Sequence, residues 1–429
     1  MTTMADNKEN RIHKSSIERE QSQTCLNSTE RENIKGSKNL NVPHLRFPEF
    51  SGEWEKCKLS EVCSFFSGGT PSSSKKEYYN GSIPFIRSGE IHVNKTELFI
   101  TEEGLNNSAA KKVEIGDLLL ALYGATSGDI AISQINGAIN QAILCIRTTQ
   151  NKKFIESVWK KHVNKLLQTY LQGGQGNLSA DIVKNISFYF ASKSEQNKLA
   201  RLVSLLDKRI STQNKIIEKL ESLIKGLNDS LYERYGDDIK TSFAELGYSY
   251  SGLSGKSAED FGTGKPFITY LNVYSNNVVN ENDYQYVQID EDEKQNVVQY
   301  GDVLFTLSSE TPEEVGIGSV YLGQDEVYLN SFCFGIHIVN EELAYSPYIS
   351  YYVSSTPFRK FIYPFAQGST RFNLCKADFE KASITLPSLD NQKRIHSVLN
   401  SISMKINTER AMLEQYVTQK QFLILQMFI

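Results

Sequence analysis

Residues 196–231 read QNKLARLVSLLDKRISTQNKIIEKLESLIKGLNDSL, and this proline-free stretch decides how the chain is organised. Its apolar residues recur at alternating steps of three and four, which is the spacing of the a and d positions of a coiled coil. The spacing predicts one long helix over residues 195–235 that pairs with another helix. The predicted seam residues are Val203, Leu206, Ile210, Gln213, Ile217, Leu220, Ile224, Leu227 and Leu231.

The same seam returns in a second proline-free stretch, residues 391–428, where Leu399 corresponds to Val203 at an offset of 196 residues. A polar residue stands at the same step in both copies, Gln213 and Glu409. The second seam is Leu399, Ile402, Ile406, Glu409, Leu413, Tyr416, Lys420, Leu423 and Met427. Preserved phase favours two helices that pack on each other, which requires them to run antiparallel. The alternative is two ordinary amphipathic helices, each packed on its own domain.

Collinear matches outside the helices extend this repeat to most of the chain. They are Leu59–Val62 with Phe243–Leu246, Ser67-Gly68 with Ser251-Gly252, Pro84–Ile86 with Pro266–Ile268, Val113–Leu119 with Val298–Leu304, Ile139-Asn140 with Leu329-Asn330, and Gln172-Gly173 with Gln367-Gly368. In each half, short β-like runs broken by Gly, Ser and Asn precede the helix; in the first half these are residues 83–87, 117–123 and 138–146. The prediction is an α+β fold: a pseudo-twofold duplicated chain with two mixed α/β domains separated by an antiparallel coiled coil of two long helices.

The predicted domain boundaries follow from these patterns. Residues 1–41 are polar and poor in aromatic residues, and are predicted to form a disordered N-terminal tail. The first mixed domain covers residues 42–190 and is followed by the first helical region, 191–240. The second mixed domain covers residues 241–386 and is followed by the second helical region, 387–429.

Composition excludes several classes of protein. No apolar run approaches ~18 residues, and no secretory signal is recognised at the start, so we expect a cytoplasmic protein without a membrane span. The six cysteines are scattered without a C-x-x-C pair, which argues against a zinc site or a disulfide framework. Phosphate-binding loops and the G-x-S-x-G and H-E-x-x-H motifs are absent, so we expect no catalytic activity. A net charge of −4 does not itself indicate nucleic-acid binding, although it allows a local basic face.

An ordered set of motifs resembles the specificity (S) subunit of type I restriction-modification systems. The motifs are Val42–Trp54, Ser67–Ser72, Ile83–Ile86, Gly116–Leu118, Tyr123-Gly124, and Asn177–Ser179 followed by Glu195–Ala200. The resemblance covers residues 42–429. The two copies differ at Ala191 and Pro387, and at Ile224 and Lys420.

The resemblance implies a non-catalytic subunit that reads double-stranded DNA. Each recognition domain would read one half of a split DNA site, and the helices would set the number of base pairs between the two halves. Two methyltransferase (M) subunits and two restriction (R) subunits would dock on it, and S-adenosylmethionine, ATP and Mg would belong to those partners, with no cofactor on this chain. The alternatives are a duplicated protein-binding adaptor without DNA contact and a self-sufficient enzyme.

Candidate DNA contacts are polar, basic or aromatic residues in turns at strand ends, because phosphates bind Lys, Arg and amides and base edges bind short polar groups. In the first domain they are Lys75, Lys76, Tyr78, Arg87, Ser88, Tyr123, Thr126, Gln172, Gln175 and Asn177. In the second they are Thr269, Tyr270, Asn272, Ser308, Ser309, Gln367, Thr370, Arg371 and Asn373. The loops 172–177 and 367–373 match each other and form the favoured pair. Plain solvation is the favoured alternative for the loop charges Lys75, Lys76 and Arg87. It is also the favoured interpretation of Lys152, Lys153, Lys160, Lys161 and Lys165.

Overall fold

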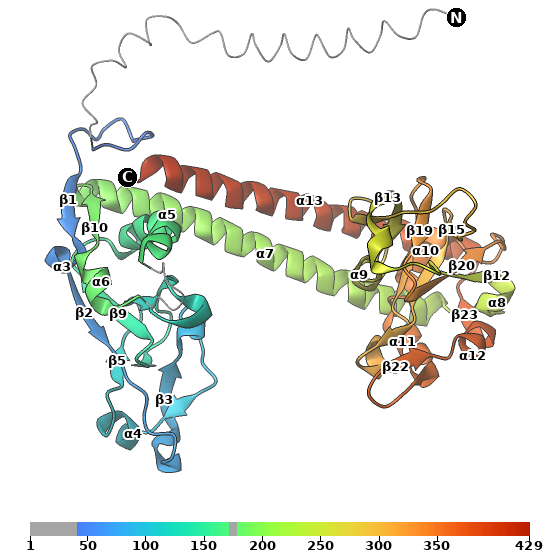
Figure 1. The fold of residues 1–429 in the computed structure, drawn as a ribbon, viewed down its shortest axis with the longest axis horizontal. Coiled ribbons are helices and arrows are strands. Elements are labelled where there is room, and N and C mark those ends of the chain that lie inside the picture. Colours follow the sequence, from blue (N-terminus) through green and yellow to red (C-terminus); the bar gives the residue numbers. More distant parts are fainter. Residues whose placement is uncertain (1–40, 171–177) are drawn as a thin grey trace, which may run out of the picture. The chain divides into compact units, whose positions relative to one another are not determined.

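The computed structural model describes residues 41–170 and 178–429 (Figure 1). The chain divides into two compact units, one ending at Arg209 and completed by Tyr416–Ile429, the other formed by Ile210–Gln415. Each unit contains a head of strands and short helices, together with one part of each of two long helices.

The head of the first unit contains two four-stranded sheets. The first has the order β2 (Cys63–Ser67), β9 (Ile143–Thr148), β6 (Leu118–Ala121), β7 (Ile130–Ile132) and is antiparallel throughout. The second has the order β4 (Phe99–Ile100), β3 (Tyr79–Ile86), β8 (Gly137–Ile139), β5 (Lys111–Val113), with β3 and β8 parallel. The helices are α3 (Leu59–Val62), α4 (Glu102–Asn106), α5 (Lys152–Tyr170) and α6 (Ala180–Asn185), with short 3-10 turns η2 (Lys76–Tyr78), η3 (Ser88–Glu90) and η4 (Gly124–Thr126).

The head of the second unit repeats this topology strand for strand. Its sheets have the orders β12 (Gly247–Ser251), β20 (Cys333–Ile338), β16 (Val303–Thr306), β18 (Gly318–Val320), and β14 (Tyr284–Val287), β13 (Phe261–Ile268), β19 (Val327–Leu329), β15 (Val297–Val298). Strands β13 and β19 are parallel, like β3 and β8. The helices are α8 (Phe243–Leu246), α9 (Tyr270–Ser275), α10 (Ser346–Tyr352), α11 (Thr356–Ile362) and α12 (Lys376–Lys381), with 3-10 turns η5 (Ala258–Asp260), η6 (Pro312–Glu314) and η7 (Tyr363–Phe365). The predicted duplication and α+β fold class are therefore confirmed.

One small sheet has no counterpart in the described part of the first head. It has the order β17 (Ser308–Ser309), β22 (Phe372–Leu374), β21 (Ala366–Gln367) and is antiparallel. In both units, a two-stranded neck joins the head to its helix. The neck is β1 (Glu55–Lys58) with β10 (Ser187–Phe190) in the first unit, and β11 (Ile239–Thr241) with β23 (Ile384–Leu386) in the second.

Matched glycines show why parts of the repeat cannot vary. A Cβ atom on Gly68 would lie 1.8 Å from the carbonyl oxygen of Ile139, and one on Gly252 would lie 2.1 Å from that of Asn330. Both contacts are far inside van der Waals distance, so only glycine lets the end of β2 or β12 pass the turn after β8 or β19. The Ser-Gly match seen in the sequence therefore marks the same close backbone approach twice.

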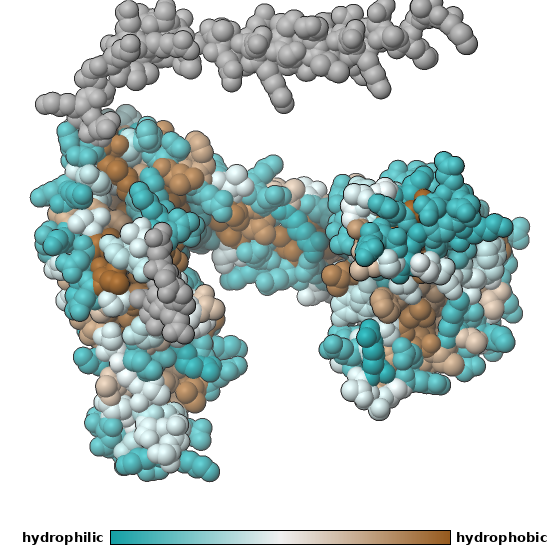
Figure 2. Space-filling model, in the orientation of Figure 1, coloured by the Kyte–Doolittle hydropathy of each residue, from teal (hydrophilic) through white to brown (hydrophobic). Residues whose placement is uncertain are grey.

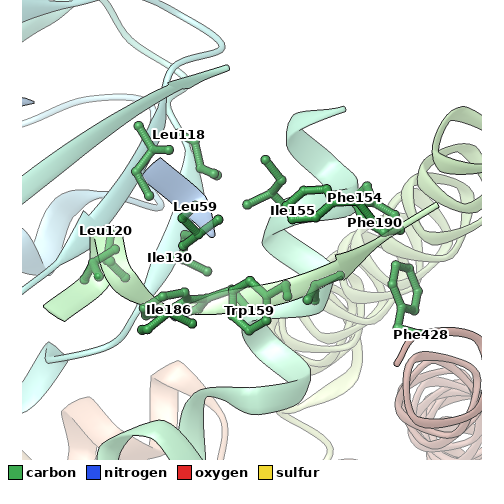
Figure 3. Close-up of a cluster of buried hydrophobic side chains, with 14 of the residues drawn as sticks. Leu59, Leu118, Leu120, Ile130, Phe154, Ile155, Trp159, Ile186, Phe190 and Phe428 are labelled. Carbon is green, nitrogen blue, oxygen red and sulfur yellow. The ribbon is translucent and has the colours of Figure 1, made fainter. Parts of the chain in front are cut away.

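In the antiparallel sheet of each head, one inner strand is buried on both faces: β6 in the first head and β16 in the second. Leu118 and Leu120 of β6 join a cluster with Trp159 and Phe154 of α5, whereas Leu119 joins a different cluster on the opposite face. Figure 3 shows the first of these clusters, including Phe190 and Phe428. Alternate side chains of a strand point to opposite faces, so burial on both sides explains the continuous apolar run, which shows no alternation.

The two long helices are α7 (Lys193–Tyr235) and α13 (Leu389–Met427), close to the predicted 195–235 and 391–428. In the first unit, the start of α7 packs against the end of α13, with Val203 and Met427 in one core cluster. In the second unit, the end of α7 packs against the start of α13, with Leu227 against the cluster of Leu399. Start meets end in both units, so the helices are antiparallel, as predicted.

Every predicted seam residue is buried or half-buried. At the polar step, the Gln213 side-chain amide donates to the backbone carbonyl of Glu409 at 3.1 Å and also to its carboxylate. Some apolar residues of the same helices are exposed, among them Leu205, Leu223 and Met404, and Figure 2 shows hydrophobic residues at the surface along the helices. Within residues 41–170 and 178–429, no helix combines the length and apolar character needed to cross a bilayer.

One predicted strand is wrong in detail. Residues 138–146 form two strands, β8 and β9, which belong to different sheets. The Asn140 side chain accepts a hydrogen bond from the backbone N–H of Ala142 at 3.1 Å and so closes a turn between the strands. Asparagine commonly stabilises such turns through its own side chain. The surrounding apolar residues favoured one continuous strand in the prediction and concealed this turn.

Candidate nucleic-acid interface

Segments far apart in the sequence meet at one edge of the second head. The Tyr270 hydroxyl, directly after β13, donates to the carbonyl of Ser308 in β17 at 2.8 Å. Strand β17 pairs with β22, placing Ser308 opposite Asn373, and Gln367 of β21 also lies opposite Asn373. The structure therefore brings most of the candidates predicted in the second head onto one edge.

Arg371 lies in the turn between β21 and β22 and is exposed. In the part of the chain that the structure describes, its guanidinium has no hydrogen bond or ion pair. Gly368 opens the turn at φ +145°, and a Cβ there would lie 2.1 Å from the carbonyl oxygen of Arg371, so the turn depends on glycine. The side chains of Gln367, Thr370 and Asn373 are also exposed on this hairpin. A free guanidinium flanked by amides matches the groups that grip guanine and adenine edges.

A fixed hydrogen-bond network lies beneath this hairpin and was not anticipated from the sequence. Tyr270 and Tyr274 stack on α9, with ring centroids 6.0 Å apart and an interplanar angle of 17°. The Tyr274 hydroxyl donates to Glu314 at 2.8 Å, and Thr311 and Ser309 donate to the other carboxylate oxygen at 2.9 and 3.1 Å. These three hydrogen bonds, with that from Tyr274 first, hold the pKa of Glu314 below its usual value. The spacing of Tyr270 and Tyr274 by four residues, one helical turn, is the signal that points to Tyr274.

Four predicted contacts in the second head have structural roles. Asn272 is completely buried; its amide donates to the carbonyls of Asn280 and Asp283 at 2.9 and 3.0 Å, and its oxygen accepts from the N–H of Asn280. It therefore fastens the loop after α9 and has no group left for a base. The Thr269 hydroxyl accepts from the N–H of Asn272 and caps α9. Ser308 and Ser309 are buried strand residues.

In the first head, the end of β3 lies beside the loop between β6 and β7. His92 and Asp129 join these segments, with 2.8 Å between Nε2 and Oδ2. Arg87 and Ser88, at the end of β3, are thereby held near the loop that carries Tyr123 and Thr126. Tyr123 is exposed, and Thr126 is half-buried.

Arg87 differs from Arg371 because its donors are already used. Its guanidinium contacts Glu90 at 2.8 and 3.1 Å and Glu97 at 3.2 Å. The hydrogen bond from Arg87 lowers the pKa of Glu90 to about 2, so the pair is ionised at neutral pH. A base contact by Arg87 would require exchange of these carboxylates.

The remaining candidates of the first head do not join this group. Lys75, Lys76 and Tyr78 precede β3 and Arg87 follows it, so they lie at the opposite end of this strand from Arg87. Tyr78 is buried, and its hydroxyl accepts a hydrogen bond from Lys75 at 2.9 Å, so it is a structural residue. Gln172, Gln175 and Asn177 lie outside the described residues, so the predicted pairing of two equivalent loops stays a prediction.

Three of the five lysines of α5 are half-buried and engaged within the protein, contrary to the predicted solvated face, whereas Lys160 and Lys165 are exposed, as predicted. Lys152 donates to the carbonyl of Gly116 at 2.6 Å, and Lys161 donates to that of Leu425 at 2.9 Å. Lys153 pairs with both Glu156 and Asp207 at 2.6 Å. These lysines tie α5 to its own unit and leave little free positive charge. Across residues 41–170 and 178–429, no group of His, Cys, Asp and Glu is arranged to hold a metal ion.

Comparison with known proteins identifies the family to which the chain is similar. The family model described as "Type I restriction modification DNA specificity domain" matches residues 51–222 and again 253–416. The chain is 29% identical over 202 residues to the type I restriction enzyme EcoR124I/EcoR124II specificity subunit of Escherichia coli, covering 45% of this chain and 49% of that protein. It is 22% identical over 422 residues to the putative type I restriction enzyme MjaX specificity subunit of Methanocaldococcus jannaschii, covering 90% and 95%.

The fold is similar to that of a solved S subunit. The crystal structure of the type I restriction-modification system S subunit from M. genitalium aligns with a TM-score of 0.55 at 12% identity, over 90% of this chain and 99% of that one. The first curated relatives are matched over only about half of their length, or less. The specificity-domain model, in contrast, matches most of this chain, once in each half. The chain therefore belongs to the family of type I restriction-modification specificity subunits.

Proposed function

We propose that this chain reads a bipartite double-stranded DNA target for a type I restriction-modification complex, with one half-site for each head. The observation that carries the proposal is the exposed hairpin of the second head, where the exposed guanidinium of Arg371 lies on the same hairpin as Gln367 and Asn373. Arg371 is the candidate for a guanine contact, and the two amides are candidates for adenine. The hydrogen bonds of Tyr270, Tyr274 and Glu314 beneath the hairpin support this role, because they hold this edge of the head in place in the absence of DNA.

The proposed role is recognition and scaffolding without catalysis. We expect two modification subunits to methylate adenine with S-adenosylmethionine, and two restriction subunits to supply ATP- and Mg-dependent translocation and cleavage. The matched helical regions support docking of partners in pairs, because a duplicated chain presents related surfaces twice.

Modular reading is tested by exchanging one head. Residues 55–190, which begin and end at the neck strands β1 and β10, would be replaced by the matching residues of a relative and expressed with modification subunits. Methylome sequencing should show a change in one half of the methylated motif and retention of the other half. A change in both halves together would contradict independent reading by the heads.

The salt dependence of DNA binding separates the proposal from a protein-binding adaptor. A DNA-reading chain releases counterions from phosphates, so its affinity should fall steeply and linearly in log–log form as salt rises. Fluorescence anisotropy with a labelled duplex measures this slope. An adaptor without DNA contact would give no binding at any salt concentration.

The spacing role of the helices is tested by shortening both. Deleting residues 210–216 together with 406–412 removes one heptad from each helix and keeps the seam in register. The pair becomes about 10 Å shorter, equal to about three base pairs, and the second half-site turns by roughly 100° around the duplex. The shortened protein should lose its native site and methylate only sites with a shorter gap, or none. Unchanged methylation of the native site would exclude the helices as the spacing element.

A further inference from the structure

A short N-terminal segment, residues 42–54, packs on the long helices in the first unit. The Phe47 side chain lies against the core cluster that includes Leu199 and Met427. The ammonium group of Lys198 lies 4.4 Å from the centroid of the Phe47 ring and also pairs with the carboxylate of Glu49. An aromatic side chain and a carboxylate two residues later therefore share one lysine.

Arg46 fixes the other end of this contact. Its guanidinium binds both oxygens of the buried Glu195, each at 2.8 Å. Such bidentate pairs set geometry as well as contributing free energy. The segment is thus held by three neighbouring contacts: a cation on Glu195, an aromatic ring on the apolar floor, and an anion on Lys198.

The corresponding surface of the second unit is an open groove. It has a volume of about 250 Å³ and is lined by Leu227, Leu231, Tyr235, Asn391, Arg394, Ile395 and Val398. At the 196-residue offset of the repeat, Arg394 corresponds to Lys198, Ile395 to Leu199, and Leu231 to Met427. The groove therefore repeats both the apolar floor and the cation of the site occupied by residues 42–54.

Exposure shows that nothing in the described chain covers this groove. Val398 is 48% exposed, whereas the corresponding Leu202 is half-buried. Arg394 is exposed and has no ion pair within the described residues. The chain passes from the end of α7 at Tyr235 to the start of β11 at Ile239, too short a connection to supply a segment like residues 42–54.

We propose that this groove docks a segment of a partner protein that carries an aromatic side chain followed two residues later by a carboxylate. The aromatic ring would enter the apolar floor, and Arg394 would bind the carboxylate as Lys198 binds Glu49. The preceding cation matters less here, because Asn391 replaces Glu195 and the nearby carboxylate of Asp238 already accepts from Asn391 at 3.2 Å. The proposal rests on the scaffolding part of the proposed function and names the chemistry of the docked partner.

The protein supplies its own probe for this site. A labelled peptide of residues 44–52, HLRFPEFSG, is titrated with the purified full chain and followed by fluorescence anisotropy. In the first unit, the equivalent site is already filled by residues 42–54 of the same chain, whose effective concentration is in the millimolar range. The added peptide therefore reports on the open groove of the second unit. We expect saturable binding, and at least tenfold weaker binding by the Arg394→Glu protein. A peptide with Glu49→Lys should bind Arg394→Glu better than it binds the original protein.

The matched control is Lys393→Glu, which makes the same charge change one residue away at an exposed position outside the groove. It should change peptide binding less than twofold, and circular dichroism should show equal helix content in all variants. Equal binding by Arg394→Glu and the original protein would overturn the proposal, as would absence of binding.

Two other occupants would also overturn it. Self-association in sedimentation that Arg394→Glu abolishes would assign the groove to a second copy of this chain. Peptide binding only after removal of residues 1–40 would assign it to the chain's own N-terminus. DNA binding is measured on the same samples, because its loss would count against the proposed function, whereas loss of peptide binding alone would count only against this docking site.

Discussion

The two units contain the same buried glutamine where the head joins its helix, and their differences lie elsewhere. Gln196 donates to the carbonyl of Ala191 at 2.8 Å and accepts from the N–H of Asn151 at 3.1 Å. Gln392 donates to the carbonyl of Pro387 at 2.9 Å and accepts from the N–H of Tyr345 at 2.8 Å. The contact uses the backbone carbonyl, so it tolerates the change from alanine to proline. Side chains that satisfy buried backbone groups are kept, while residues at exposed strand ends are free to diverge.

A second matched pair shows a shared residue with different partners. Asp117 and Asp302 are both buried and both accept from the backbone N–H three residues earlier, at 3.0 and 2.9 Å. Asp117 pairs with Arg147 at 2.7 Å, whereas Asp302 accepts from the Tyr250 hydroxyl at 2.5 Å and faces His337. The turn is the same, but the charge balance of the two units differs.

The largest effect is expected from the shared glutamines. Gln392→Leu removes the side-chain partner of three backbone groups: the carbonyl of the buried Pro387, and the N–H of Tyr345 and the carbonyl of Leu343, which are half-buried. A buried unsatisfied group costs about 1–3 kcal/mol and each half-buried group, which water can reach, about 1 kcal/mol, so the second unit should lose about 3–5 kcal/mol. Gln196→Leu should cost the first unit less, because one of its partners is the side chain of Gln150, which can turn to water.

Calorimetric unfolding measures both losses, and hydrogen exchange locates them. Faster exchange is expected in the second unit only for Gln392→Leu, and in the first unit only for Gln196→Leu. Equal destabilisation of both units by one change would contradict separate anchoring of the two heads.

The seam provides the next largest contrast. Lys420 occupies the position that Ile224 holds in the other copy, and it pairs with Asp207 at 2.5 Å. Lys420→Ile should change the free energy of unfolding by less than about 1 kcal/mol, because Asp207 keeps Lys153. Ile224→Lys places a charge beside a hydrophobic cluster and should cost about 2 kcal/mol. Urea unfolding compares the two, and equal losses would contradict an asymmetric seam.

The two arginines at strand ends differ by their partners. Arg371→Ala should weaken binding at the second half-site by about 1–3 kcal/mol, with relaxed preference for one base. Arg87→Ala should have a smaller effect, because Arg87 must first leave Glu90 and Glu97. Competition assays with single-base variants of each half-site measure both. Uniform weakening across all sequences would instead identify Arg371 as a phosphate contact.

The smallest effect concerns pH. Burial raises the pKa of Asp117, but hydrogen bonds from Arg147 and the backbone outweigh it, and the pKa lies below its usual value. Its stabilisation is therefore present above the ordinary pKa of ~3.9 and is lost as pH falls through the lowered value. Burial raises the pKa of Asp302 and prevails over its hydrogen bonds. The second unit therefore loses stability as pH rises from ~3.9 through the raised value.

Asparagine substitutions test these opposite signs. At pH 7, Asp117→Asn should destabilise the first unit by about 1 kcal/mol, a modest value because Arg147 is partly exposed. Asp302→Asn should be neutral or stabilising in the second unit. Urea unfolding between about pH 2 and pH 7, with hydrogen exchange for each unit, measures both, and the same sign for both changes at pH 7 would contradict the difference.

Repetition made the fold predictable, whereas the candidate site depends on tertiary contacts. The seam and the matches at Gly68 and Gly252 are local signals, and they yielded the duplication and the antiparallel helices. The burial of Asn272 and the capture of Arg87 by Glu90 were not predictable, because a polar residue in a loop looks the same whether it faces solvent or its own backbone. Glu314 was not predictable for the same reason, since its partners come from α9, from β17 and from the turn that follows β17.

The two-stranded neck has a consequence for inheritance. The chain enters the first head through β1 and leaves it through β10, and these two strands pair with each other. In the second head the corresponding pair is β11 and β23. A crossover in the gene at these two places would replace a whole head and leave the helix and its glutamine anchor intact. Under the proposed function, such an exchange would give a lineage a new half-site, while the helical surface proposed to bind partner subunits would pass unchanged to its descendants.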